Sequence, residues 1–473
     1  IKLPHNFIGR LTFLSQETGN AAVFGSNLLG QRMGDQAIPS GTEAPFLNLA
    51  GSSIDPEDIA IAPGHYRVVA VRGPEYEARE LKIVATAGTI TRLELAPLAR
   101  VAPTPGWLGA DFHVHSGESF DSALPQPLQV VAFAASGAEV LVATEHDRVF
   151  DPRPAILATG LNQHLVGVTG VEVTSAYEGG DSPYASGHLN AFPYTAVPAA
   201  NRGGAPSLEG RRIRDALADI AAAPQNTLKP FVQMNHPRPG PNEQEGDTYF
   251  SHLGVAGIPF DPSLPLSEAP NNVLIEKNPS HGGRDLDYHG VEIMNGQELI
   301  RYRRVRADWF NLMLQGERII ATANSDSHRL GVIVGLPRTY VAVEDDRIET
   351  FDQGELMASL RKGAAWGTTG PLLQVHLGDT PLGGLHTGES ATLHIQVDAA
   401  PWVPLSEWRA YVNGELVHRA PIKAGESADL PLIFAKDSFV TVEVEGPREG
   451  LYAEALPEFT PFAFTNPIFV DAD

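Results

Sequence analysis

The sequence predicts a chain of three parts, in which an α/β core lies between two β-rich domains. Three observations lead to this prediction. Between about residues 106 and 370, continuous apolar runs alternate with amphipathic runs, as expected for buried parallel strands joined by helices. On either side, apolar and polar residues alternate as in half-buried strands. The Pro-rich stretch 101–106 is a stiff linker, so we expect domains at 1–105, 106–370 and 371–473.

The first domain has the pattern of a small antiparallel β-domain. Alternating runs separated by Gly and Pro predict its strands. Residues 25–63 are rich in Gly, Ser and Pro and predict an irregular excursion. The expected strands are 10–14, 64–72, 80–85 and 89–95.

The central part predicts a parallel barrel or a doubly wound sheet. A helical run at 127–135, ended by Gly137, precedes a continuous apolar strand at 139–144. In both folds the carboxyl ends of the strands carry the functional site. Further strands are predicted at 165–174, 189–192, 230–235, 290–294 and 319–324, and helices at 208–222 and 298–315.

Two other segments have a different texture. Residues 237–287 contain many Pro, Gly, Asn and Ser residues, which predicts either a lid that contacts substrate or a surface decoration. After residue 370 strand patterns return at 392–397, 407–412 and 438–444, with a hairpin signal at Asn413-Gly414. We expect a C-terminal β-sandwich, which would cover the edges of the barrel or form contacts in a homo-oligomer.

The composition narrows the classes of function. Lys and Arg total 34 against 57 acidic residues, and the net charge of −23 argues against nucleic acid or an anionic membrane surface as partner. The negative charge does not exclude a small-molecule substrate. The chain has no Cys, so any metal must be held by nitrogen and oxygen. It begins at Ile1 without an apolar leader, which favours a processed periplasmic or secreted form over a cytoplasmic one.

The most informative stretch is Asp-Phe-His-Val-His-Ser at 111–116. In a strand, alternate side chains share a face, so His113 and His115 point the same way while Phe112 and Val114 pack. Two neutral imidazoles on one face can bind a metal ion. Alone the pair is weak evidence, because a His-x-His pair on a strand is more often a surface or core feature than a metal site.

The other predicted strand ends supply comparable side chains. Ten of the sixteen His residues lie between His113 and His328, and six of those ten sit at strand ends. A barrel or a doubly wound sheet would bring these ends together. The nine candidate metal ligands are His113, His115, Asp121, His146, Glu172, His188, His236, Asp326 and His328.

The order of these motifs resembles the polymerase and histidinol phosphatase (PHP) superfamily of metallohydrolases. The shared features are Asp-x-His-x-His, an acid in the next loop, Thr-Glu-His-Asp, Gly-Val-Glu, Gly-His, Asn-His-Pro and Ser-Asp-Ser-His, over roughly residues 106–345. The segments 367–372 and 461–471 are similar to its carbaryl-hydrolase-like branch. One departure concerns Thr144-Glu145-His146-Asp147, where many relatives read Thr-Asp-His-Asn; the extra carboxylates leave the hydrogen bonding around His146 open.

The resemblance implies a distorted (β/α)7 barrel with two or three divalent ions of zinc, manganese or iron. It implies that Glu172 bridges the first two ions. Among groups that are not ligands, Ser116, Ser325 and Ser327 would support turns or ligands. By resemblance, His113, His115, Glu172 and Asp326 would hold the first ion, Glu172, His188 and His236 the second, and Asp121, His146 and His328 the third.

The expected activity is hydrolysis by a hydroxide that bridges two ions, and the catalytic candidates include Glu172 and Asp326. The branch resemblance favours carbamate or aryl-ester bonds, and phosphoester hydrolysis is the alternative. A surface binding protein with a vestigial barrel is an alternative of another class. Arg238 and Arg329 could each reach an anionic group or an oxyanion, or form salt bridges with acidic residues.

Several neighbouring residues carry weaker expectations. Asp111 and Asp147 would orient ligands. Asn295 could lie at the mouth of the site, and Glu292 is expected to face packing or the rim.

Overall fold

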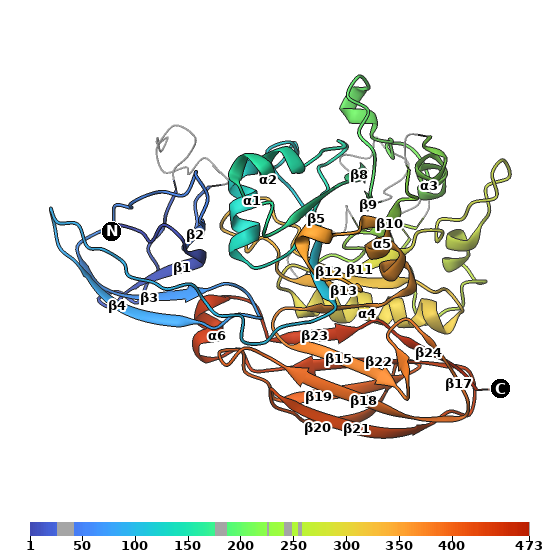
Figure 1. Ribbon diagram of the computed structural model, residues 1–473. Helices are drawn as coiled ribbons and strands as arrows, with labels where there is room; N and C mark the ends of the chain where they lie inside the picture. The colour runs from blue at the N-terminus through green and yellow to red at the C-terminus, as the bar shows by residue number, and fades with distance from the viewer. Residues whose placement is uncertain (26–41, 176–186, 225–226, 241–247, 254–257, 473) are drawn as a thin grey trace.

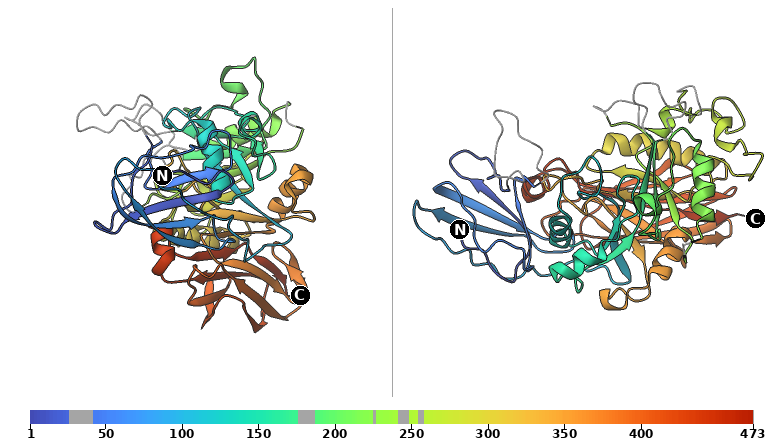
Figure 2. Two further views of the ribbon diagram at one scale, coloured as in Figure 1. Left: turned by 60° about the vertical axis from the view of Figure 1, so that its left-hand side comes forward. Right: turned by 90° about the horizontal axis from the view of Figure 1, so that it is seen from above.

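We describe the protein from a computed structural model that covers residues 1–25, 42–175, 187–224, 227–240, 248–253 and 258–472. Figure 1 shows three regions, with an N-terminal sheet to one side, a central region with most of the helices, and a C-terminal region built of strands. Seen from above in Figure 2, the N-terminal sheet projects from one end of the molecule. Within the described ranges, no helix has both the length and the apolar character needed to cross a bilayer.

The N-terminal region is a four-stranded antiparallel sheet, and three of its strands match predicted ones. The strand predicted at 89–95 is wrong, since Arg92 makes only an isolated bridge there, and β2 lies within the segment 25–63 that we expected to be irregular. Inward-facing residues such as Phe13 and Val68 are fully buried in a core of their own. The sheet has the order β2-β1-β3-β4, with β1 Ile8–Ser15, β2 Leu47–Ala50, β3 Gly64–Val71 and β4 Arg79–Ala85.

The central region contains one parallel group and one separate mixed sheet. In the parallel group β5, β6 and β7 run side by side. In the mixed sheet β8, β9 and β10 pair antiparallel, whereas β10, β11 and β12 pair parallel. These strands are β5 Trp107–Val114, β6 Val140–Ala143, β7 Val166–Thr169, β8 Val171–Ser175, β9 Gly187–Phe192, β10 Phe231–Met234, β11 Gly290–Asn295 and β12 Ile320–Asn324.

Five helices lie in the described part of the central region, and α1, α3 and α4 are close to the three that the sequence predicts, whereas α2 and α5 were not predicted. The central helices are α1 Gln126–Ala135, α2 Arg153–Thr159, α3 Ile213–Ala222, α4 Leu299–Leu314 and α5 Gln353–Lys362. The described part of the insertion at 237–287 contains the short 3-10 helices Tyr249–Ser251 and Asn271–Ile275, and Phe250 and Leu274 are buried in the same core as α3 and α4. Two more 3-10 turns lie at Asn201–Gly204 and Ile348–Thr350.

The prediction of a (β/α)7 barrel is wrong. Strands hold 34% of the residues and helices 17%, and the described strands form several sheets that do not close into a barrel. The reason is the run 165–174, which divides at Gly170 into β7 and β8 in different sheets. A Cβ at Gly170 would lie 2.8 Å from the carbonyl oxygen of Ala143, so only glycine fits there. The antiparallel pairing of β9 then breaks the parallel series that a (β/α) barrel needs.

The two central sheets nevertheless meet at their strand ends. Isolated parallel bridges join Val114 to Ser327 and His146 to Glu172. The amide of Asp326 also donates a 2.9 Å hydrogen bond to the carbonyl oxygen of His113. The carboxyl ends of β5, β6 and β12 and the amino end of β8 therefore lie together without closure of a barrel.

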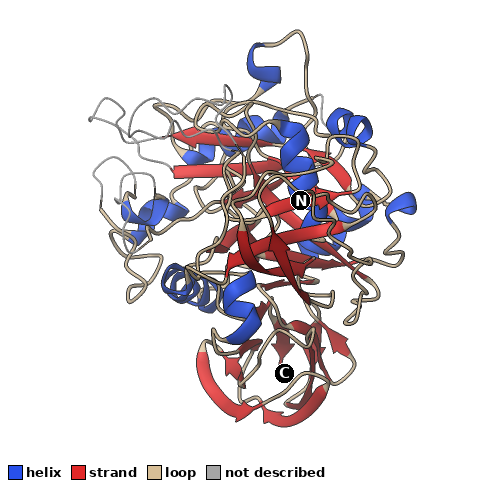
Figure 3. Cartoon of the chain, turned by 90° about the vertical axis from the view of Figure 1, so that its left-hand side faces the viewer, coloured by secondary structure: helices blue, strands red, loops and turns tan. Residues whose placement is uncertain are grey.

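The C-terminal region has two facing sheets that share a buried core, and its strands form the lower part of Figure 3. The predicted hairpin at Asn413-Gly414 is confirmed, because β19 and β20 pair antiparallel across it. One sheet has the order β16-β15-β18-β21, and the other path β17-β24-β22-β23-β14 continues through β13 into β5. The bounds are β13 Arg338–Ala342, β14 Ala365–Thr368, β15 Leu372–Leu377, β16 Thr380–Pro381, β17 Leu385–Thr387, β18 Ser390–Asp398, β19 Glu407–Val412, β20 Glu415–Pro421, β21 Glu426–Ile433, β22 Ser438–Glu445, α6 Gly450–Ala455, β23 Phe462–Thr465 and β24 Ile468–Asp471.

Candidate metal centre

The two histidines of the Asp-Phe-His-Val-His-Ser stretch share one face at the end of β5. Both are fully buried, and their ring centroids lie 5.1 Å apart. Phe112 and Val114 are buried in two different apolar clusters. The alternation that the sequence predicts is therefore present at this point of the chain.

Glu172 on β8 lies among four imidazoles. Its Oε1 is 3.2 Å from Nε2 of His113 and 3.1 Å from Nδ1 of His188. Its Oε2 is 3.2 Å from Nε2 of His115 and 3.0 Å from Nδ1 of His146. This carboxylate is fully buried, so its negative charge requires cationic neighbours.

Asp326 follows β12 and lies beside two of the same imidazoles. Its Oδ1 lies 3.2 Å from Nε2 of His113 and 3.3 Å from Nε2 of His115. Its Oδ2 lies 3.9 Å from Nε2 of His236. The left-handed φ of 49° at Asp326 and of 23° at His236 indicate backbone strain at the strand ends, as often found at functional sites.

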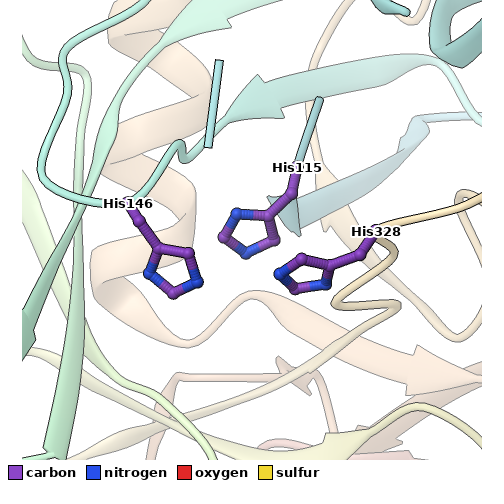
Figure 4. Close-up of side chains that lie close together, drawn as sticks. All are labelled: His115, His146 and His328. Atoms are coloured by element: carbon purple, nitrogen blue, oxygen red, sulfur yellow. The ribbon is translucent and has the colours of Figure 1, made fainter. Parts of the chain in front are cut away.

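A further group of ligands comes from the end of β5, the loop after it, and the segments after β6 and β12. The ring of His115 lies 4.6 Å from that of His146 and 4.0 Å from that of His328, and Figure 4 shows the three rings turned toward one another. Asp121 completes this cluster, since its Oδ2 lies 3.2 Å from Nε2 of His146 and 3.1 Å from Nε2 of His328. All nine predicted ligands therefore lie in one place.

The donor atoms fit divalent cations. A metal–ligand bond of about 2.1 Å places neighbouring ligand atoms roughly 3.0–3.4 Å apart, which spans most of the separations above. Within the described residues, four groups of three side chains each bring their ligand atoms within 4.8 Å of one another. Five buried atoms of the cluster lack a hydrogen-bond partner, as expected for atoms that bind an ion. They are Nε2 of His113, Nε2 of His115, Oε2 of Glu172, Oδ1 of Asp326 and Nε2 of His328.

Hydrogen bonds behind the rings fix which imidazole nitrogen faces the centre. The Ser119 hydroxyl lies 2.6 Å from Oε2 of Glu145, to which it donates. The hydroxyl oxygen of Ser119 also lies 2.9 Å from Nδ1 of His115 and therefore accepts a hydrogen bond from it. Nε2 of His115 is left with its lone pair toward the carboxylates, as metal binding requires.

Glu292 serves His113 in the same way. Its Oε1 lies 3.0 Å from Nδ1 of His113, and its Oε2 accepts from the amide of His236 at 3.0 Å. Glu292 therefore supports the ligands, which sequence reasoning missed by assigning it to packing or the rim. A signal was available, because Gly290-Val291-Glu292 repeats the Gly-Val-Glu motif of Glu172.

The extra carboxylates around His146 do not face its ring. Glu145 is buried and accepts from the backbone amide and the hydroxyl of Ser116 as well as from Ser119. Asp147 accepts from the amide of Thr174 at 3.0 Å. Both carboxylates therefore tie loops together.

Asp111 likewise joins two segments that carry ligands. Its carboxylate accepts from the amides of His113 at 3.1 Å and of Ser325 at 3.2 Å. Burial raises the pKa of Asp111 to about 7 despite these hydrogen bonds. Asn295 is buried and donates to Oδ2 of Asp326 at 3.0 Å. It thus contacts a ligand and does not line an open mouth.

The charges of the cluster depend on one another. Burial alone would raise the pKa of Glu172, but the imidazoles around it, His113 foremost, hold it well below its usual value. Burial alone would lower the pKa of His113, but the carboxylates around it, Asp326 foremost, raise it well above its usual value. Burial, and then the nearby His188, lower the pKa of His236 to about 4, which favours the neutral form that binds metals.

The two candidate arginines differ in their surroundings. Arg238 donates to both carboxylate oxygens of Asp308, at 2.8 and 2.9 Å, so its guanidinium is held by a salt bridge as the second alternative anticipated. Arg329 follows His328 and its side chain is exposed. Of these two, only Arg329 is exposed, and it directly follows the ligand His328 in the sequence.

No protein-family model matches the sequence, and no curated protein matches it. The assignment to the PHP superfamily therefore stays a prediction that rests on the order of the motifs.

Proposed function

We propose that the chain is a metal-dependent hydrolase with two or three divalent ions at the strand ends. The observation that carries this proposal is the set of five buried ligand atoms without hydrogen-bond partners, within a cluster of nine nitrogen and oxygen ligands. A buried group of this kind is costly to the fold unless cations compensate it. The motif order supports the same conclusion independently of the geometry.

The motif order predicts three ligand sets. The distances agree with it only in part, because they place His236 with His113 and Asp326, and His188 with His146 and Glu172. In this assignment Glu172 belongs to the first two sets, and its Oε1 lies 3.2 Å from Nε2 of His113 in one and 3.1 Å from Nδ1 of His188 in the other. Bound ions of this kind lower the pKa of a shared water to near neutrality and polarise the oxygen of a carbonyl or phosphoryl group. We assign His113, His115, Glu172 and Asp326 to the first ion, Glu172, His188 and His236 to the second, and Asp121, His146 and His328 to the third.

The side chains hold and orient the centre and none needs to act as nucleophile. The Ser116 hydroxyl donates to Glu145 at 2.5 Å, and the hydroxyls of Ser325 and Ser327 lie 3.1 Å apart. These serines are therefore engaged in supporting the loops. A phenolic leaving group departs without a strong general acid, which suits carbamate and aryl-ester substrates.

The charges beside the site favour a neutral substrate over a phosphate. Arg148 is paired with Glu118 at 3.2 Å, and Arg238 with Asp308. Phosphate recognition usually recruits arginine. The exposed Arg329 is the specific feature that favours the alternative, hydrolysis of phosphoesters.

The test combines metal content with a substrate panel. The full chain is supplemented with zinc, manganese or iron, its bound metal is measured by elemental analysis, and it is offered p-nitrophenyl acetate, 1-naphthyl methylcarbamate and p-nitrophenyl phosphates. We expect two or three ions per chain and turnover of the ester or the carbamate that a chelator abolishes. Glu172→Gln should lower the ion count and reduce turnover more than 100-fold. Glu118→Gln, which changes a nearby acid outside the cluster, is the matched control.

Two other outcomes would replace this proposal. Turnover of phosphates alone would assign the site to phosphoesters. Less than one ion per chain, with no hydrolysis of any substrate in the panel, would favour a binding protein with a vestigial metal site.

A further inference from the structure

A large apolar side chain stands in the open beside the metal ligands. Phe120 is 76% exposed, and its ring centroid lies 4.7 Å from that of His146. Single exposed apolar residues are normal on protein surfaces. The position of Phe120 is therefore the informative feature, because it directly precedes the ligand Asp121.

The loop that carries Phe120 is fixed on both sides of the residue. Before it, the Ser119 oxygen accepts from the amide of His146 at 3.1 Å and its hydroxyl donates to Glu145. After it, Asp121 contacts His146 and His328. Phe120 is thus held in a defined place over the third ligand set, so little ordering is needed when another ring packs against it.

Solvent reaches the centre from the side of Phe120. The side chain of Asp121 is 39% exposed and that of His328 is 26% exposed, whereas those of His113 and Glu172 are fully buried. A substrate that approaches the ligands from this open side passes Phe120. The adjacent Glu118 and Arg148 are paired with each other, which leaves the phenyl ring as the apolar contact there.

We propose that Phe120 is a specificity-determining residue that packs against an aromatic ring of the substrate. Offset or edge-to-face contact between aromatic rings is favourable beyond the apolar area that it buries. This inference rests on the proposed hydrolase function and narrows its substrates to aryl esters and aryl carbamates. Phe120 would act in binding and would take no part in bond cleavage.

The experiment compares an aromatic with a non-aromatic ester of similar leaving-group acidity. Phenyl acetate and hexafluoroisopropyl acetate serve for this purpose, with Phe120→Ala, Phe120→Trp and the metal-loaded full chain. We expect Phe120→Ala to raise the KM for phenyl acetate about 5- to 10-fold, with little change for the fluoroalkyl ester. Phe120→Trp should keep the KM for phenyl acetate. Ile433→Ala, on β21 of the C-terminal region, removes a side chain of similar exposure as the matched control.

A binding measurement keeps this inference separate from the activity. The Kd of 1-naphthol, measured by calorimetry, should weaken about 5- to 10-fold in Phe120→Ala. If the wild-type chain hydrolyses neither ester while Phe120→Ala still binds 1-naphthol more weakly, only the proposed function is refuted. Equal changes of KM for both esters, or an unchanged Kd for 1-naphthol, would refute the role of Phe120.

Discussion

Replacing Ser119 with alanine should weaken metal binding without removing a ligand. The Ser119 oxygen links three groups, since it donates to Glu145 and accepts from Nδ1 of His115 and from the amide of His146. Glu145 and His115 are fully buried, so neither can replace the lost partner with bulk water. The ring of His115 would then lose the hydrogen bond that holds its metal-binding nitrogen toward the centre.

Two magnitudes follow from these contacts. A hydrogen bond to a charged group contributes about 1.5–3 kcal/mol, so Ser119→Ala should lower the free energy of unfolding by about 2–3 kcal/mol in the metal-free chain. Loss of a group that orients a ligand typically reduces metal affinity about 10- to 100-fold. The second effect is the diagnostic one, because an ordinary loss of stability leaves the affinity of the folded chain unchanged.

The assay is a competition between the protein and a chromophoric chelator for zinc, with urea unfolding of the metal-free chain measured in parallel. Ser122→Ala is the control, since Ser122 lies in the same loop. Its hydroxyl donates a 2.8 Å hydrogen bond to the backbone carbonyl of His328, and not to an imidazole. Ser122→Ala should keep the zinc affinity. Equal zinc affinities for the wild type and Ser119→Ala would refute the assignment of the tautomer of His115.

Two further predictions concern charges outside the centre. Burial, and then the nearby Glu75, raise the pKa of Glu139 from 4.5 to about 7, so its contribution to stability is complete below pH 4.5 and is lost as the pH rises through about 7. Glu139→Gln should therefore be more stable than the wild type by up to about 3 kcal/mol at pH 8 and similar to it near pH 4.5. Thermal unfolding of both proteins across this pH range measures the difference. A difference in stability that does not change with pH would contradict the prediction. Asp308→Ala leaves the guanidinium of Arg238 without its carboxylate and should lower the free energy of unfolding, measured in urea, by about 3–5 kcal/mol. A decrease below about 1 kcal/mol would show that this salt bridge does not stabilise the fold.

Local patterns predicted most elements, but not how the strands combine. The helix expected at 127–135 is α1, and the hairpin signal at Asn413-Gly414 stands between β19 and β20. Closure of a barrel depends on the direction in which distant strands pair, which local periodicity does not encode. The run 165–174 has one continuous apolar pattern, yet Gly170 divides it between two sheets.

The candidate site was more predictable than the fold because its ligands sit at strand ends, where a polar residue after an apolar run is conspicuous. Glu292 escaped this reasoning because it lies within β11, a strand that is buried throughout, and not at the end of the strand. Its role depends on the position of His113, 179 residues away in the chain. A contact of that kind is set by the packing of two sheets, so the Gly-Val-Glu pattern at 290–292 does not by itself reveal the partner.

The geometry also explains how the cluster can assemble without a closed barrel. A metal centre needs the ends of its strands to meet, and the bridges from Val114 to Ser327 and from His146 to Glu172 supply that meeting directly. Two open sheets joined at these strand ends can therefore bring the ligands together without a barrel. The left-handed backbone at His236 and Asp326 follows from this arrangement, because each chain must turn sharply after its strand to aim a ligand at the seam between the sheets.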